Sequence, residues 1–248
     1  MLTAKHSSNM IDTVMTDRQS DILLEVVRLY ADSAEPVSSR ELSRTFGLSS
    51  ATIRAEMAHL EEAGYIHQPH ISAGRVPTDK GYRYYVNNVT EQQASPSGRS
   101  LQTITKRVDS LKDRTDSAIK IAAETLSDLT GNMAFATLSD TVYFHGLNQL
   151  FSQPEFAAQI EASQAARFLD AMQAWLFESK LDNLQVYIGR ENPVVETSGL
   201  TMIVNRFTSP YSQHSYIGIV GPTRQSYGKV MNLVETTSQA LEEVFSEV

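Results

Sequence analysis

The sequence predicts an α+β protein in which an N-terminal helical domain, one long linking helix and a C-terminal antiparallel sheet with helices follow one another. Three observations support this prediction. Residues 16–64 form three short amphipathic segments with capping residues, and residues 101–130 repeat apolar side chains at intervals of three and four. From residue 131 onward, strand-like and helical patterns alternate. The 248 residues are enough for two domains of ordinary size.

The composition is that of a folded protein without cysteine chemistry. Apolar residues make up 41% of the chain, and 21 Lys and Arg stand against 29 Asp and Glu, a formal net charge of −8. This charge excludes a protein that coats nucleic acid by bulk attraction, but it permits a local basic site. The absence of cysteine excludes disulfides, thiolate metal sites and Cys nucleophiles. No apolar run approaches the roughly 18 to 20 residues of a membrane span, and no secretory signal opens the chain, so we expect a cytoplasmic protein.

Residues 16–64 predict three short helices joined by tight turns. Each helix is preceded by a serine or threonine whose side-chain oxygen can accept a hydrogen bond from the first turn. Gly47 ends the second helix. Residues 1–15 show no sustained period, and we expect them to form a disordered tail. The predicted N-caps are Thr16, Ser38 and Ser49.

A hairpin and a fourth helix follow the first three helices. Residues 65–77 contain two prolines, Gly74 and few helix formers, a composition that is typical of a hairpin. Thr78 then caps a helix that runs to about Val89 and carries three tyrosines. Helix-turn-helix followed by hairpin is the layout of a winged-helix DNA-binding domain, here residues 16–89. In such a domain the third helix enters the major groove.

The apolar stripe of the third helix predicts which of its residues face DNA. Ile53, Met57 and Leu60 lie on one side. A rotation of 100° per residue turns Arg54 and three alanines to the other side. Arg54 is the one long donor there, suited to guanine or to a phosphate, and the small alanines let the helix approach base edges. The candidate DNA-binding residues of the whole domain are Ser38, Arg40, Ser49, Ser50, Ala51, Thr52, Arg54, Ala55, Ala58, Gln68, His70, Ser72, Gly74, Arg75, Lys80 and Arg83.

The basic residues after the third helix have expected roles at the DNA backbone. Arg75 lies at a glycine-flanked hairpin tip, where its length and charge fit a minor groove or the adjacent backbone. Lys80 and Arg83, on the fourth helix, are placed to clamp phosphates. The net charge of this part does not indicate whether it binds DNA, because residues 1–90 hold 9 Lys and Arg against 11 Asp and Glu.

Each of these interpretations has a structural alternative. Arg54 can instead pair with Glu61 or Glu62 on its own helix. The three tyrosines of the fourth helix can pack in the core rather than stack on bases. His67 and His70 resemble metal ligands, but no third partner is near them in the sequence, so we expect no metal.

A linker and a long helix separate the two halves of the chain. The polar residues 90–100 contain a proline and a glycine and predict the linker. Residues 101–130 then show heptad-like spacing and predict one helix. Its apolar seam fits packing within one chain or a contact between two chains. The candidate dimer contacts are Leu101, Ile104, Val108 and Leu111.

Residues 131–248 predict a small antiparallel sheet with helices on one face. Helical patterns extend over residues 154–180 and 226–246. The strand-like segments are residues 135–144, 184–189, 200–207 and 215–220.

Several segments of this chain resemble the HrcA family of bacterial heat-shock repressors, in the same order. The resemblance is most specific in SSATIRAEMAHLEEAGYI, residues 49–66, and in QPHISAGRVPTDKGYRYYV, residues 68–86. The other similar segments are TDRQSDIL, EPVSSREL, LSDLTGNMA, FHGLNQLFSQPEF, IGREN and IGIVGPTRQSYGKV.

The resemblance implies a homodimeric repressor that binds double-stranded DNA at an inverted repeat, the CIRCE element, ahead of chaperone operons. It also implies that a GroE-type chaperonin keeps the repressor active, and that residues 131–248 form a GAF-like domain. Two departures stand out. Residues 1–15 precede the family's usual beginning, which makes Met15 a candidate start. The interval between LSDLT and FHGLNQLF is too short for the family's early GAF-like strands and its inserted dimerisation segment, so we expect a reduced GAF-like domain and a dimer contact on helix 101–130.

Two functions of other classes are weighed against a repressor. A small ligand bound in the GAF-like domain could control DNA affinity, although the aromatic residues that could line such a site fit a core equally well. Those residues are Tyr187, Tyr211, His214 and Tyr216. An enzyme is not expected, because the chain has no G-x-S-x-G, H-E-x-x-H or Walker motif, so we predict no catalytic residue and no cofactor.

Overall fold

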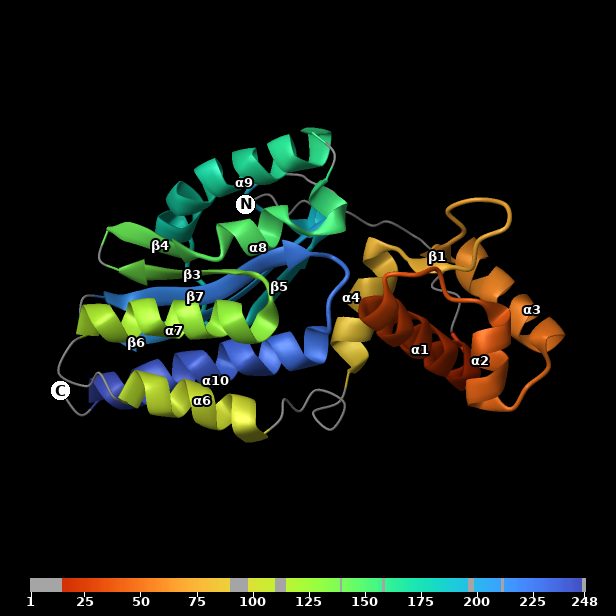
Figure 1. The fold of residues 1–248 in the computed structure, drawn as a ribbon, viewed down its shortest axis with the longest axis horizontal. Coiled ribbons are helices and arrows are strands. Elements are labelled where there is room, and N and C mark those ends of the chain that lie inside the picture. Colours follow the sequence, from red (N-terminus) through yellow and green to blue (C-terminus); the bar gives the residue numbers. More distant parts are fainter. Residues whose placement is uncertain are drawn as a thin grey trace, which may run out of the picture.

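The computed structural model describes residues 15–89, 98–109, 115–138, 140–157, 159–195, 199–210 and 212–246. Over these residues, a helical N-terminal part lies beside a C-terminal part built around a sheet (Figure 1). The tail predicted for residues 1–15 lies outside the described residues except for Met15, which is half-buried and packs against the N-terminal core. Within the described residues, no helix has both the length and the apolarity to cross a bilayer.

Three helices and a small hairpin form the N-terminal part, as the sequence predicts. Each predicted N-cap accepts a hydrogen bond from the amide three residues further on, from Gln19, Glu41 and Thr52 in turn. The two short strands pair antiparallel, and Val37, just before the second helix, forms a further bridge to Arg75. The elements are α1 (Asp17–Ser33), α2 (Ser39–Phe46), α3 (Ser50–Glu62), β1 (Ile66–His67), β2 (Val76–Pro77) and α4 (Asp79–Asn88).

The C-terminal part contains a five-stranded antiparallel sheet in the order β4-β3-β7-β6-β5. The segment 135–144, predicted as one strand, is a hairpin of two strands, so that part of the prediction is wrong. The strands are β3 (Met133–Leu138), β4 (Thr141–His145), β5 (Gln185–Ile188), β6 (Leu200–Ser209) and β7 (Ser212–Pro222).

Helices cover both faces of this sheet, and not one face as the sequence suggests (Figure 1). Side chains alternate between the faces of a strand, and on β3 both sets are apolar. Ala134 and Ala136 belong to one core cluster, whereas Met133 and Phe135 belong to the other. On the first face lie α6 (Gly98–Asp109), α7 (Thr115–Thr130) and α10 (Tyr227–Ser246); on the second lie α8 (Leu147–Phe151), the 3-10 turn η1 (Pro154–Phe156) and α9 (Gln159–Glu178).

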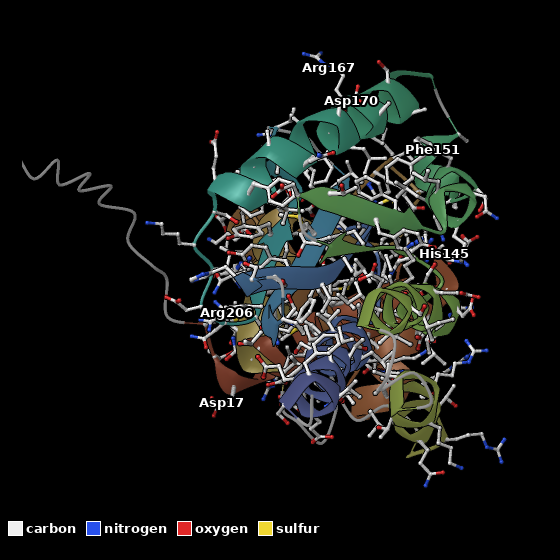
Figure 2. All side chains as sticks on the ribbon, turned by 90° about the vertical axis from the view of Figure 1, so that its left-hand side faces the viewer. Asp17, His145, Phe151, Arg167, Asp170 and Arg206 are labelled. Atoms are coloured by element: carbon white, nitrogen blue, oxygen red, sulfur yellow. The ribbon has the colours of Figure 1, made fainter. Side chains whose placement is uncertain are left out.

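The second face is closed to solvent by α9, the longest helix on that side. Its inner residues Phe168, Met172 and Leu176 are buried against the sheet. Figure 2 shows its labelled side chains Arg167 and Asp170 on the opposite, outer side of the helix. The helix is therefore amphipathic, as expected for an element that covers one face of a sheet.

The single long helix predicted over residues 101–130 is instead two helices, α6 and α7, that pack against each other and against α10. Ile104 and Val108 are 0% exposed because these neighbouring helices cover them. The dimer-contact prediction is therefore wrong for both, and their seam packs within one chain. Leu101 is half-buried against the same cluster, and Leu111 lies outside the described residues. The predicted linker is also shorter, since residues 98–100 belong to α6 and residues 90–97 are not described.

The two parts share a core where α4 meets α10. The rings of Tyr82 and Tyr85 lie 5.6 and 6.5 Å from the ring of Tyr227, centroid to centroid. Tyr227 is completely buried, and this burial raises the pKa of its phenol well above the ordinary value. Tyr84 is half-buried and packs edge-on against Tyr65. These tyrosines therefore take the core-packing alternative rather than forming a platform for bases.

Candidate nucleic-acid interface

The outer face of α3 presents one arginine among small residues. Ile53, Met57 and Leu60 are buried, which confirms the predicted stripe. The opposite residues Ala51, Arg54, Ala55 and Ala58 are exposed. Arg54 does not pair with the carboxylates of its own helix; its Nε donates to the Ser39 hydroxyl at 3.3 Å, which holds the guanidinium near the start of α2.

The start of α3 carries hydroxyls that are already used by the helix itself. Ser49 Oγ accepts from the amide of Thr52 at 3.1 Å and lies 2.9 Å from the Thr52 hydroxyl. One of these two hydroxyls donates its proton to the other, so the remaining hydroxyl keeps a proton that can be donated to a phosphate oxygen. Ser38 caps α2 in the same way, while Ser50 is half-buried and Arg40 is exposed.

Arg75 anchors the wing to α3. Its Nη2 and Nε lie 2.9 and 3.0 Å from Oε2 of Glu61, and its side chain is only partly exposed. The other oxygen of Glu61 accepts from the backbone N–H of Gln68 at 2.9 Å. The sequence predicts Arg75 as a contact at the hairpin tip, but the structure places it at the base of the hairpin, where much of its charge is met by Glu61.

Gln68 and Gly74 build the wing rather than extend from it. Gln68 Nε2 donates to the carbonyl oxygens of Ile71 and Ala73 at 3.1 and 2.9 Å. Gly74 lies so close to the chain before α2 that a Cβ there would be 2.3 Å from the Val37 carbonyl oxygen. Glycine is therefore required for the Val37 bridge that joins the wing to α2.

A groove of about 270 Å³ lies between α2, α3 and the wing. It brings together on one side of the domain several predicted residues that are distant in sequence. Its lining is Val37, Ser38, Ser39, Arg54, Met57, Ser72, Ala73, Gly74 and Arg75.

The two basic residues of α4 have other partners in this structure. Lys80 Nζ donates to the Ala63 carbonyl at the end of α3 and lies 4.2 Å from the centroid of the Tyr65 ring. Arg83 faces the C-terminal part, where its guanidinium binds both carboxylate oxygens of Glu191 and the Val186 carbonyl oxygen. The phosphate-clamp prediction is thus wrong for Arg83, because its charge is bound between the two parts of the chain.

The contact between the parts has a second polar element that sequence reasoning missed. The Asp79 carboxylate accepts a hydrogen bond from the Arg190 amide at 3.3 Å, in the turn η2 (Gly189–Glu191). A Cβ on Gly189 would lie 2.2 Å from the same carboxylate, so the approach is close. Partners separated by more than a hundred residues leave no local signal in a single sequence.

The aromatic residues considered for a ligand site do not converge on one pocket. Tyr216 is buried in the sheet, and its hydroxyl donates to the Ser179 carbonyl at 2.9 Å. Tyr187 packs edge-on against Trp175, His214 is exposed, and Tyr211 lies outside the described residues. A cavity of about 560 Å³ lies elsewhere, between α1, α2, α4 and the start of α10.

The N-terminal part is thus a winged helix-turn-helix, a class of domain that is typical of DNA-binding regulators, and it is docked on an α+β body. A family model described as "Winged helix-turn-helix transcription repressor, HrcA DNA-binding" matches residues 14–91. A second, "HrcA protein C terminal domain", matches residues 86–231. The chain belongs to the HrcA family of heat-inducible transcription repressors, which are not enzymes.

Curated relatives agree with this assignment. A heat-inducible transcription repressor HrcA from Brevibacillus brevis is 40% identical over 154 residues, which cover 60% of this chain and 44% of that protein. Another from a Thermoanaerobacter species is 26% identical over 336 positions, covering 94% of this chain and 98% of that protein. Those 336 positions exceed the 248 residues of this chain by 88, so the chain is considerably shorter than that relative.

A solved structure with the same fold supports the architecture. It is a crystal structure of a hypothetical protein, with a TM-score of 0.74, and the match covers 94% of this chain and 99% of that one. At 18% sequence identity, the similarity establishes the shared arrangement of winged helix and sheet and nothing about activity.

Proposed function

We propose that this chain represses chaperone operons by binding, as a homodimer, an inverted-repeat operator of the CIRCE type. The observation that carries the proposal is the outer face of α3, where Arg54 stands among exposed alanines beside the groove formed with the wing. Arginine can bind guanine or a phosphate, and alanine methyl groups can contact thymine methyl groups. The match of residues 14–91 to a DNA-binding family model supports double-stranded DNA as the partner of this face.

We infer a homodimer from the size and the symmetry of the proposed operator. One winged helix contacts too little DNA to compete with the non-specific sites of a genome. Two copies related by a two-fold axis place their recognition helices one DNA turn apart, or a multiple of it, on an inverted repeat. Because Ile104 and Val108 are covered by their own chain, the dimer contact has to use a surface other than the α6 seam.

Modulation by a GroE-type chaperonin is part of the same proposal. It rests on the family resemblance, in which heat shock relieves repression when unfolded proteins occupy the chaperonin. A reduced GAF-like C-terminal part also belongs to the proposal; it is supported by the family resemblance and by the shorter length of this chain compared with the Thermoanaerobacter relative. Adding purified chaperonin to the DNA-binding assay tests this modulation. We expect chaperonin to increase the fraction of the protein that is able to bind the operator.

The test of the main proposal is a fluorescence-anisotropy titration against a CIRCE-type inverted repeat and a scrambled duplex at two salt concentrations, with the mass of the protein measured by light scattering. We expect tight binding by a dimer to the inverted repeat and weaker, more salt-sensitive binding to the scrambled duplex. Equal, salt-sensitive binding to both duplexes would contradict an operator of this type.

Control by a small ligand is the alternative function. The cavity of about 560 Å³ favours it, because residues of α1 and α2 line one wall and residues of α10 line another. A ligand bound at this junction would contact both parts and could change the orientation of the winged helix relative to the C-terminal part. A thermal-shift screen with a metabolite panel tests this alternative; a ligand that raises the melting temperature and changes operator affinity would support it.

A further inference from the structure

The tip of the wing presents an isoleucine to solvent. Ile71 is 96% exposed, whereas the other exposed large apolar side chains of the described residues, Leu147, Phe151 and Phe177, are 38 to 44% exposed. Single exposed apolar residues are common on protein surfaces, but one with almost no neighbours in its own chain gains nothing from folding. In the wing, this side chain is accessible to a partner outside the chain.

The exposure of Ile71 is fixed by the construction of the loop. The Gln68 side chain holds the carbonyls of Ile71 and Ala73, and the Ala73 amide donates to the His70 carbonyl at 2.8 Å. At the base of the loop, Val37 and Arg75 exchange two backbone hydrogen bonds of 2.9 Å each. These bonds restrict the loop from both sides, so the side chain of Ile71 is held outward and does not fold back onto the domain.

The surroundings of Ile71 suit an anionic partner. The wing segment from His67 to Arg75 contains no carboxylate, although residues 1–90 carry more acidic than basic side chains. The carboxylate of Glu61, which contacts the base of the wing, is bound by Arg75. Residues 72–75, directly after Ile71, line the same groove as Arg54, so the wing tip and the outer face of α3 belong to one side of the domain.

We propose that Ile71 inserts into the minor groove of operator DNA beside the major-groove site of α3, where its side chain packs against sugars and base edges. This inference rests on the proposed operator binding and adds a contact to it. Apolar side chains are used in this way by proteins that read the minor groove, and pyrimidine–purine steps yield to them most readily. The 2-amino group of guanine projects into the minor groove and obstructs such a contact, whereas an A·T pair leaves the groove floor open.

Two substitutions in the full chain measure the contact. Ile71→Ser removes the apolar surface, and Ile71→Leu restores it with a different shape. Because the side chain has almost no contacts in its own chain, both variants should keep the melting temperature of the parent. In the anisotropy titration, Ile71→Ser should bind the operator about tenfold more weakly and Ile71→Leu nearly as well as the parent. Leu147→Ser, which alters an exposed apolar residue on α8, is the matched control and should bind as the parent does.

A pair of duplexes tests which groove is involved. Their half-sites are identical, and the flanking positions contain either G·C or inosine·C pairs, which differ only by the 2-amino group in the minor groove. The parent protein should prefer the inosine duplex, and Ile71→Ser should lose that preference. If the parent binds no inverted repeat selectively, the proposed operator function fails. If the parent is selective but Ile71→Ser keeps its affinity and its flank preference, the minor-groove contact is refuted. A changed mass in light scattering with unchanged DNA affinity would likewise refute it, because the tip would then be a protein contact.

Discussion

Replacing Ile104 by alanine distinguishes a residue of the chain's own core from one on a surface between two chains. Ile104 is 0% exposed on α6 and packs with residues of α7 and α10. Removing its side chain down to the methyl group leaves a cavity between three helices, and such changes cost about 2–5 kcal/mol. Single domains are stable by about 5–15 kcal/mol, so the loss is a large part of the total.

Urea unfolding followed by circular dichroism measures this change, since the midpoint falls while the slope stays constant if only stability is lost. Leu101→Ala is the matched control: the side chain is half-buried on the same helix, and we expect roughly half the destabilisation. Light scattering on the folded variant should show the mass of the parent. A stable Ile104→Ala protein that has become monomeric would refute the reasoning, because the side chain would then lie between chains and not within one.

Four further predictions concern the outer face of α3 with the wing, and the contact between the two parts. Arg54→Ala should relax sequence preference in the anisotropy titration, since a lost bidentate base contact costs about 1–3 kcal/mol. If the variant still discriminates between operator and scrambled duplex as the parent does, Arg54 is a solvated helix residue that makes no base contact. Gly74→Ala should lower both the melting temperature and the operator affinity, because its Cβ would lie 2.3 Å from a backbone carbonyl oxygen and break the wing's bridge to α2; a parent-like melting curve would contradict this. Arg83→Gln and Glu191→Gln should each cost roughly 1 kcal/mol or less, and the double variant should cost less than their sum, since the pair is partly exposed; additive losses in a double-mutant cycle would show that the two side chains do not interact. Burial raises the pKa of Tyr227 in the folded state, so the neutral phenol stabilises the fold fully below the ordinary tyrosine pKa of about 10, and this contribution is lost as the pH rises above it; urea midpoints between pH 8 and pH 11 should fall less in Tyr227→Phe than in the parent.

Local features of the fold could be predicted from the sequence because their causes lie within a few residues. Thr16, Ser38 and Ser49 were identifiable as N-caps since the hydroxyl and the amide that it binds are three residues apart. The inner stripe of α3 follows from the helical period alone, and with it the outward direction of Arg54.

Features that depend on distant partners could not be predicted. The seam of α6 shows that one face of the helix is covered, but the period is the same whether α7 and α10 or a second chain covers it. Arg83 and Lys80 are basic residues after a wing, and their binding to Glu191 and to the end of α3 depends on how the chain folds back. The second layer of helices could have been predicted from the sequence. The residues Met133–Ala136 on β3 are all apolar, so both faces of this strand have to be covered.

The exposure of Ile71 could not be predicted for a different reason. In a sequence, a lone isoleucine in a hairpin is more often a core residue than a tip residue. Only the hydrogen bonds of Gln68 and the bridge of Arg75 show that the loop turns this side chain outward.

The meeting of α4 with α10 has a consequence for how the protein responds to heat. One continuous apolar cluster contains Ile22 and Leu42 of the winged helix together with Ile203 and Leu241 of the sheet layer. Parts that share a core lose it together, so we expect one calorimetric transition rather than two. The winged helix should then unfold at the same temperature as the C-terminal part. The operator would be released over the narrow range of a cooperative unfolding step, in addition to any release that a chaperonin controls.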